Sequence, residues 1–217
     1  MKQKLLELLH ATTKKNKLPL RILLAALGVL TMGFGMSVLE KLHFGTDPFT
    51  CMNNGISMVS GISLGTVALL VSAVLFVVVI FTDISSIGIG TLFNMVGFGY
   101  SIDLFRLIWA HVGFTEAPTG ALRYVLLVGM LIVFILAVSL YLAADLGSAP
   151  YDAMPVYIAK KSGIRFVFVR MAWDLCAVLI GFLLGSAVGV TTLVCALLVG
   201  PAAAVVQKGV DKLLGTV

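Results

Sequence analysis

The chain has 217 residues, of which 60% are hydrophobic and 12% are charged, and its mean hydropathy is +1.10. Soluble domains carry about 25% charged residues, so this composition excludes a water-soluble fold. The formal net charge of +5 gathers in lysine and arginine clusters without interleaved aromatic residues. Such clusters fit the cytoplasmic loops of a membrane protein and argue against a nucleic-acid partner.

Residues 1–17 form a basic segment in which leucines stand among the lysines. This pattern predicts a short amphipathic helix on the inner leaflet of a membrane. A cleaved signal peptide fits poorly, because the apolar stretch after Arg21 is too long and no cleavage site precedes a soluble domain.

Long apolar runs follow along the rest of the chain. Four of them have 18 to 21 residues without a charge: Ile22–Leu39, Leu64–Thr82, Ile84–Ile102 and Tyr124–Ala144. A fifth, Leu175–Gln207, has 33 residues, enough for most of two helices. A helix crosses the membrane core with about 20 apolar residues, and only helices satisfy their own backbone hydrogen bonds within such a run. The sequence therefore predicts an all-α, polytopic membrane helix bundle with six long helices.

A short phrase containing glycine and proline occurs twice, at an offset of 102 residues. The two copies are Gly45-Thr46-Asp47-Pro48-Phe49 and Gly147-Ser148-Ala149-Pro150-Tyr151. Each copy follows a long apolar stretch headed by an arginine, and these arginines, Arg21 and Arg123, keep the same offset. The match indicates two sequence repeats. We therefore predict a first membrane repeat at 18–110, a linker at 111–120 and a second membrane repeat at 121–211, packed as one domain.

Each repeat contains a short segment after the phrase, Pro48–Ile62 in the first and Pro150–Gly163 in the second. At 1.5 Å per residue, about 14 residues reach roughly 21 Å, which is less than the membrane core. These segments are either re-entrant half-helices or short tilted crossings. Three crossings per repeat would invert the second repeat relative to the first, and four would leave the two repeats parallel.

Charge and length favour different numbers of crossings. With eight crossings only Lys41 lies outside, whereas six crossings also place Arg106 and Arg123 outside, so the positive-inside rule favours eight. Segment length favours six. We give the charge rule slightly more weight and keep both versions. Both place the N-terminus and the C-terminus in the cytoplasm.

The repeated phrases also predict a solute site. Glycine permits a sharp bend and proline fits the first turn of a helix, so Gly45, Pro48, Gly147 and Pro150 are candidate hinges. Helix N-termini inside a membrane attract anionic or carboxylate groups. The polar residues around the two short helices are the candidate solute contacts: Thr46, Asp47, Asn53, Asn54, Ser148, Tyr151 and Asp152. The alternative interpretation is that these are ordinary turns and polar contacts between packed helices.

Arg170 and Asp174 are four residues apart on a predicted crossing, so they share one face of the helix. Ionisable residues within a membrane are functional candidates, and this pair is the candidate coupling site. A structural ion pair is the alternative, because Arg170 is close enough to the cytoplasmic surface to reach it. Asp103 and Arg106 lie near a helix end, and we interpret them as an interfacial pair. Pro201 interrupts the last helix and is a further candidate hinge.

Signals for catalysis and for metal or cofactor binding are weak. The three histidines, His10, His43 and His111, have no partner at the spacing of a metal site or a catalytic triad. The three cysteines lie in apolar or helical stretches, also without metal-like spacing. We therefore expect no enzyme activity, no cofactor and no metal site.

Two further motifs are Gly88-Ile89-Gly90-Thr91 and Leu198-Val199-Gly200-Pro201. Together with the repeated phrases, the second of which continues to Asp152, they resemble the YczE/YitT-type family of bacterial integral membrane proteins, specifically its YczE-like branch. The resemblance covers nearly the whole chain from about Arg21 onward, with Thr191-Thr192 as a modest departure. It implies a multi-spanning protein of the bacterial plasma membrane, but it implies no substrate and no site residue.

These observations lead us to expect a small-solute transporter or permease with a central site between the two repeats. The helix ends favour an anionic or carboxylate-bearing solute, and the other partner is the lipid bilayer. The alternative is a non-transporting scaffold or accessory protein whose basic segments bind a membrane partner. A homo-oligomer is compatible with both. The transporter hypothesis requires that the two helix breaks lie side by side around a shared chamber.

Overall fold

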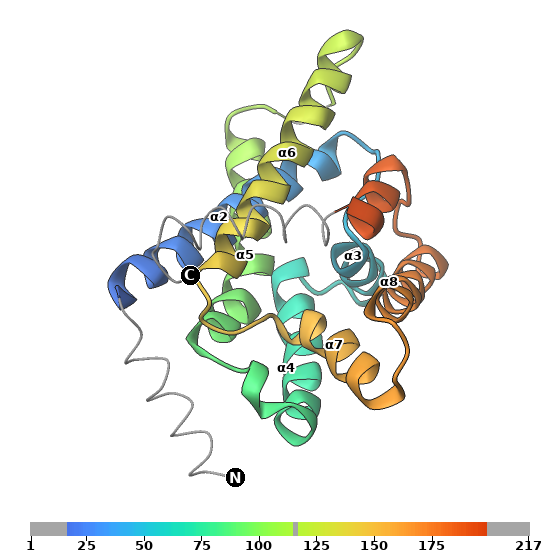
Figure 1. The fold of residues 1–217 in the computed structure, drawn as a ribbon. Helices are drawn as coiled ribbons and strands as arrows, with labels where there is room; N and C mark the ends of the chain where they lie inside the picture. Colours follow the sequence, from blue (N-terminus) through green and yellow to red (C-terminus); the bar gives the residue numbers. More distant parts are fainter. Residues whose placement is uncertain (1–16, 115–116, 199–217) are drawn as a thin grey trace.

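The computed structural model describes residues 17–114 and 117–198, and every regular element within these ranges is helical (Figure 1). The elements in chain order are α2 (Leu18–Lys41), α3 (Pro48–Ser60), α4 (Leu64–Thr82), the 3₁₀ helix η1 (Ile84–Ser86), α5 (Ile89–His111), α6 (Ala121–Ala143), α7 (Pro150–Ser162) and α8 (Phe166–Leu183). A further helical stretch covers 190–198. The predicted all-α class is confirmed. Most of the basic N-terminal segment and the Pro201 hinge lie outside the described residues.

Four helices, α2, α4, α6 and α8, are long and apolar enough to cross a membrane. Their outer faces carry large exposed apolar side chains, such as Val74 (66% exposed) and Leu175 (68% exposed). Side chains of this kind suit contact with lipid. By contrast, α3 and α7 have 13 residues each, so each spans only about 20 Å. The bundle therefore combines long helices with two short ones, as the sequence predicts.

One predicted helix has different boundaries in the structure. The apolar run predicts a helix over Ile84–Ile102, whereas the chain forms a 3₁₀ turn at Ile84–Ser86 and then α5 at Ile89–His111. The helix continues through the charged residues Asp103 and Arg106. Within the helix these two side chains form an ion pair with each other, at 3.1 Å.

Helices α2 and α6 run antiparallel. At the start of α2, Arg21 Nη1 donates to the carbonyl oxygen of Ala144, just past the end of α6, at 3.0 Å. At the start of α6, Arg123 Nη2 donates to the carbonyl oxygen of Leu42, just past the end of α2, at 2.6 Å. Between these contacts, a Cβ atom on Gly28 would lie 2.9 Å from a backbone nitrogen of α6. A small residue at such a position lets two helices approach closely.

Contacts also fix the directions of α4 and α5. Helix α5 runs parallel to α2, because Ser101 bonds to Val29 and Trp109 bonds to Ser37, in the same order along both helices. The first turn of α4 donates a hydrogen bond to Asp103, which lies in the second half of α5. From there α4 packs along α5 in the opposite direction. Helix α4 is therefore antiparallel to α2. The segment between them, including α3, connects two helix ends on the same side of the bundle.

The two halves of the described chain show the same unusual backbone geometry at an offset of 102 residues. Helices α3 and α7 both start with a proline and both end before a glycine in the left-handed region. Positive φ angles recur in matching pairs, which are His43 (55°) and Asp145 (51°), Gly45 (86°) and Gly147 (103°), and Gly61 (71°) and Gly163 (72°). Glycine adopts these angles at little cost, so the two glycines of the Gly-x-x-Pro phrases permit the turns before α3 and α7.

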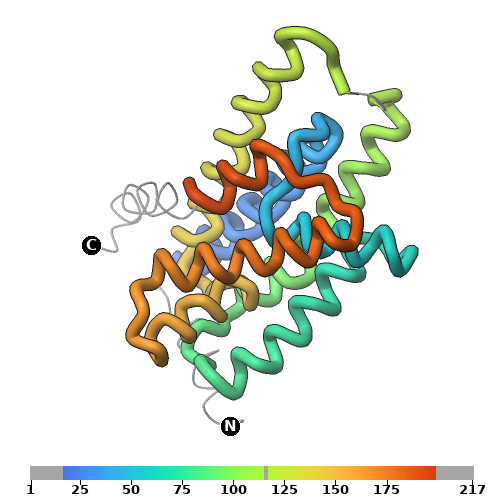
Figure 2. Tube along the Cα trace, turned by 90° about the vertical axis from the view of Figure 1, so that its right-hand side faces the viewer, coloured from blue at the N-terminus to red at the C-terminus, as the bar shows by residue number. Residues whose placement is uncertain are grey.

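Each Gly-x-x-Pro turn packs against a helix start in the other half of the chain. The N–H of Gly90, in the first turn of α5, donates to the carbonyl oxygen of Leu146 at 2.7 Å. In the same way, the N–H of Thr191 donates to the carbonyl oxygen of Phe44 at 2.9 Å. Figure 2 shows the start of the last helical stretch, in red, beside the turn before α3, in light blue. The short helices cross over as well, since α3 packs on α8 and α7 packs on α4.

Candidate functional site

The two short helices meet at their N-terminal turns. Phe49, the second residue of α3, and Tyr151, the second residue of α7, have ring centroids 5.0 Å apart. Both side chains are buried, and the two positions are separated by the 102-residue offset. The two helix starts that follow the Gly-x-x-Pro turns therefore lie side by side inside the bundle.

The start of α3 is capped by Asp47. Its Oδ1 atom accepts hydrogen bonds from the N–H groups of Phe49 and Thr50, both at 3.1 Å. Pro48 occupies the first helical position, where no N–H is needed. A carboxylate at this place stabilises the positive end of the helix dipole. The positive end of α3, which the sequence predicts to attract an anionic solute, is therefore already occupied by a carboxylate of the protein.

An ion cluster lies at the start of α7. Arg170 Nη1 bonds to Asp152 Oδ1 at 2.7 Å, and Arg170 Nε bonds to Asp174 Oδ2 at 2.9 Å. The hydroxyl group of Tyr151 donates to the other oxygen of Asp174 at 2.7 Å. The Asp174 side chain is 2% exposed, whereas those of Arg170 and Asp152 are 28% and 38% exposed. The structure therefore unites two predicted solute contacts with the predicted coupling pair.

The charges around the two helix starts do not balance. Asp47 lies close enough to Asp174 for mutual repulsion, and Asp152 adds a third carboxylate. Arg170 is the cation that contacts two of the three. With all four side chains ionised, their formal net charge is −2. Acidic side chains therefore outnumber basic ones in this group of four.

Several buried polar atoms in this region lack a hydrogen-bond partner among the described residues. They are Thr46 Oγ1, Asp47 Oδ2, Thr50 Oγ1, Asn53 Oδ1, Trp173 Nε1 and Thr191 Oγ1. The amide nitrogen of Asn53 does have a partner, the carbonyl oxygen of Phe49, at 2.8 Å. A buried polar group without a partner costs about 1–3 kcal/mol, so each one requires a ligand, an ion, a water molecule or a functional reason.

Two predicted solute contacts, Asn54 and Ser148, lie outside this cluster. Asn54 Oδ1 accepts a hydrogen bond from Arg106 Nη2 at 2.9 Å, on a different face of α3. The N–H group of Ser148 donates to the carbonyl oxygen of Ser86 at 3.0 Å. Adjacent helical positions are about 100° apart, so Asn53 and Asn54 face different neighbours.

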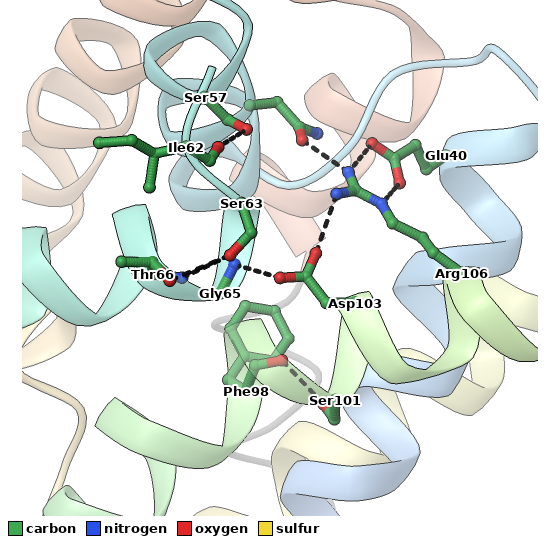
Figure 3. A network of polar contacts seen from close by, with 11 residues as sticks. Glu40, Ser57, Ile62, Ser63, Gly65, Thr66, Phe98, Ser101, Asp103 and Arg106 are labelled. Atoms are coloured by element: carbon green, nitrogen blue, oxygen red, sulfur yellow. Dashed lines mark hydrogen bonds and ion pairs between the residues drawn. The ribbon is translucent and has the colours of Figure 1, made fainter. Parts of the chain in front are cut away.

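The Arg106 network joins four helices (Figure 3). Arg106 bonds through Nε to Glu40 Oε2 at 2.8 Å and through Nη1 to Asp103 Oδ1 at 3.1 Å. Asp103 also accepts the N–H of Gly65, at the start of α4, at 2.7 Å. With Asn54, the network ties together α2, α3, α4 and α5. Glu40 was not among the predicted partners, since only the folded chain brings it to Arg106.

An apolar cavity of about 380 Å³ adjoins the ion cluster and opens onto the outer faces of α4 and α8. It lies between α4 and α8, and one residue each of α3 and α7 completes its wall. The lining residues are Met52, Leu70, Val71, Val74, Leu75, Tyr151, Trp173, Cys176, Ala177 and Ile180. Its volume suits a small organic molecule. Tyr151 belongs to both the cavity and the ion cluster, so a bound molecule could contact apolar and charged groups together.

Comparisons with known proteins identify the family. A model described as "Family of unknown function (DUF6198)" matches residues 19–208. The chain belongs to this family. An "Uncharacterized protein" of Haemophilus influenzae is 30% identical over 182 residues, which cover 82% of this chain and 78% of the relative.

A second relative bears on the predicted resemblance to the YczE-like branch. The "Uncharacterized membrane protein YczE" of Bacillus subtilis is 27% identical over 190 residues, which cover 86% of this chain and 85% of the relative. The resemblance to the YczE-like branch is therefore confirmed, and the chain is a membrane protein. No solved structure matches.

Proposed function

We propose that this protein is a small-solute transporter whose central site lies where α3 and α7 meet. The contact between Phe49 and Tyr151 carries the proposal, because it joins two interrupted segments beside a buried ion cluster. Interrupted helices that meet between two halves commonly form the solute site of secondary transporters. Four of the predicted hinge residues, Gly45, Pro48, Gly147 and Pro150, lie next to this site, in the turns before α3 and α7 or at the starts of these helices.

We further propose that the halves are duplicated units with opposite orientations in the membrane. The matching helices α2 and α6 are antiparallel, which requires an odd number of crossings in each half. Three crossings per half, with α3 and α7 re-entrant, meet this requirement, whereas the eight-crossing version requires parallel halves. Arg106 and Arg123, which count against six crossings, are bound to Glu40 and to the carbonyl oxygen of Leu42. Their positions thus have a structural cause that competes with the positive-inside rule.

The charge of the site favours a positively charged solute over the anion that the helix ends suggest. Asp152 and Asp174 outnumber Arg170, and the start of α3 is already occupied by Asp47. The neighbouring cavity offers an apolar surface with the ring of Trp173 in its wall, and aromatic faces attract cations. A small organic cation with an apolar body matches both features.

A fluorescence assay tests this function. The chain has two tryptophans, so a Trp109→Phe background leaves Trp173 as the reporter in the cavity. Organic cations that change its fluorescence are then tested for uptake into vesicles containing the purified protein. We expect Asp174→Asn to weaken the affinity by about ten-fold or more, which corresponds to 1.4 kcal/mol. Asp145→Asn, which changes a 63% exposed carboxylate, is the matched control. Binding that is the same in both variants rules out the site, and binding without uptake rules out transport.

A scaffold is the second candidate, and one surface favours it. Lys160, Lys161 and Arg165 cluster at the connection between α7 and α8, and all three are exposed. A basic surface of this kind suits an acidic partner or anionic lipid headgroups. Co-purification of a partner through these residues, together with an absence of solute flux, would support the scaffold.

A further inference from the structure

We propose that the start of α3 forms a binding site for a dehydrated monovalent metal cation, with sodium as the first probe. The inference deepens the proposed function, because such an ion would be the coupling ion of the transporter. Its residues nevertheless differ from those of the ion cluster at α7. The two proposals can therefore fail separately.

The site consists of five buried side-chain oxygens. Thr50 and Asn53 are three residues apart, so they share one side of α3, and Thr46 directly precedes the capping residue of this helix. Asp47 contributes Oδ2, because only Oδ1 caps the helix. The fifth oxygen belongs to Thr191, whose N–H group is bound to the turn before α3. All five residues are at most 9% exposed.

By hydrogen-bond geometry these oxygens have no partner among the described residues, although the Thr50 hydroxyl group is near enough to interact with the Asp47 carboxylate. Asp47 Oδ2 and Asn53 Oδ1 can only accept hydrogen bonds, while the threonine hydroxyls can donate or accept. Each unpaired group costs about 1–3 kcal/mol when buried. A single cation would satisfy carboxylate, amide and hydroxyl oxygens at once.

The chemistry of the oxygens selects the kind of cation. Oxygen-only sites suit hard cations, and the described residues contain no cluster of three His, Cys, Asp or Glu side chains for a transition metal. Divalent ions usually draw several carboxylates, but here only Asp47 offers a buried, unpaired carboxylate oxygen among the described residues, because the neighbouring Asp174 is bound by Tyr151 and Arg170. A proton on Asp47 could pair with Thr50 but would still leave the oxygens of Thr46, Asn53 and Thr191 without a partner. A monovalent metal ion therefore fits best.

The cap of α3 makes a cation tolerable at this place. A helix N-terminus carries partial positive charge, which opposes a cation. Asp47 Oδ1 accepts the first free N–H groups of α3 and neutralises that end. The second oxygen of the same carboxylate remains for the ion, so one residue serves both the helix and the ligand.

Thermal unfolding of the purified, full-length protein tests the site. An ion that binds only the folded state raises Tm with its concentration. We expect Tm of the parent to rise from choline chloride to sodium chloride at equal ionic strength. The isosteric variants Thr50→Val and Thr191→Val should lose this rise, and Thr50→Ser should restore it. Thr82→Val is the matched control, since its hydroxyl bonds to Val78 within α4.

The outcomes separate this inference from its rivals. Equal Tm values in sodium, potassium and choline salts overturn it, as does a sodium effect that both valine variants retain. A Tm that depends on pH and not on the metal salt also overturns it, in favour of a proton or ordered water. Sodium binding by a protein that moves no solute leaves the ion site intact and refutes only the transporter.

Discussion

Arg123 holds the end of α2 from 81 residues away, through hydrogen bonds from Nε and Nη2 to the carbonyl oxygen of Leu42. Its guanidinium group also lies 4.4 Å from the ring centroid of Phe44. The last carbonyl groups of a helix lack partners within the helix, so this residue replaces a missing bond and adds a cation–π contact.

We expect Arg123→Met to lower the free energy of unfolding by about 1–3 kcal/mol, because it leaves a buried carbonyl without its charged donor. Urea or thermal unfolding in detergent measures the loss. Arg165→Met is the control, since Arg165 is exposed at the start of α8. Equal losses in the two variants would show that only the number of charges matters.

The proposed orientation of the halves predicts where two equivalent serines lie. Ser60 and Ser162 end α3 and α7, and both are exposed. In a background without native cysteines, Ser60→Cys should react with an impermeant thiol reagent from outside and Ser162→Cys only from inside. Labelling of both from the inside would support eight crossings and parallel halves.

Two glycines predict opposite effects of the same substitution. A Cβ at Gly28 would lie 2.9–3.1 Å from the backbone of α6, whereas a Cβ at Gly129 meets nothing within 4 Å. Gly28→Ala should therefore separate α2 from α6 and cost about 1–3 kcal/mol of stability. Gly129→Ala should be neutral or stabilising, because alanine favours the helix by about 1 kcal/mol. Thermal unfolding of both variants decides, and a loss in Gly129→Ala as large as that in Gly28→Ala would contradict the packing argument.

Asp83, at the end of α4, predicts a pH effect outside the membrane-spanning segments. Its pKa is lowered, first by the hydrogen bond from the Ser85 hydroxyl and also by Ser86 and Lys160, against the opposing effect of partial burial. A lowered pKa in the folded state stabilises the protein above the ordinary carboxyl pKa of about 4. This stabilisation is lost as the pH falls through the folded-state value.

Tm measured between neutral and acidic pH tests this effect in the parent and in Asp83→Asn. The variant should lose the part of the acid sensitivity that Asp83 supplies. Parallel curves with a constant offset would show that the carboxylate does not titrate differently in the folded state.

The local features of the candidate site were predictable from short-range patterns. Pro48 and Pro150 mark the first residues of α3 and α7, because proline suits that position. The spacing of four residues between Arg170 and Asp174 predicts their contact on one helix face. These features depend on residues within one or two helical turns of each other, so spacing in the sequence is enough to predict them.

The long-range features were not predictable in the same way. Glu40 and Arg106 are 66 residues apart, and no spacing rule connects them. Asn53 and Asn54 differ in role because one faces the helix start and the other faces α5, which depends on how the helices pack. The Gly88 motif was visible in the sequence, but its contact with the Leu146 turn appears only after folding.

The exchange of turns between the halves constrains how such a polypeptide can be divided or shortened. The donor group of Gly90 finds its acceptor at Leu146, and that of Thr191 finds its acceptor at Phe44. A fragment that ends in the linker would retain the N–H group of Gly90 and the carbonyl oxygen of Phe44 without their partners. Within the membrane, no water molecule would be present to replace those partners.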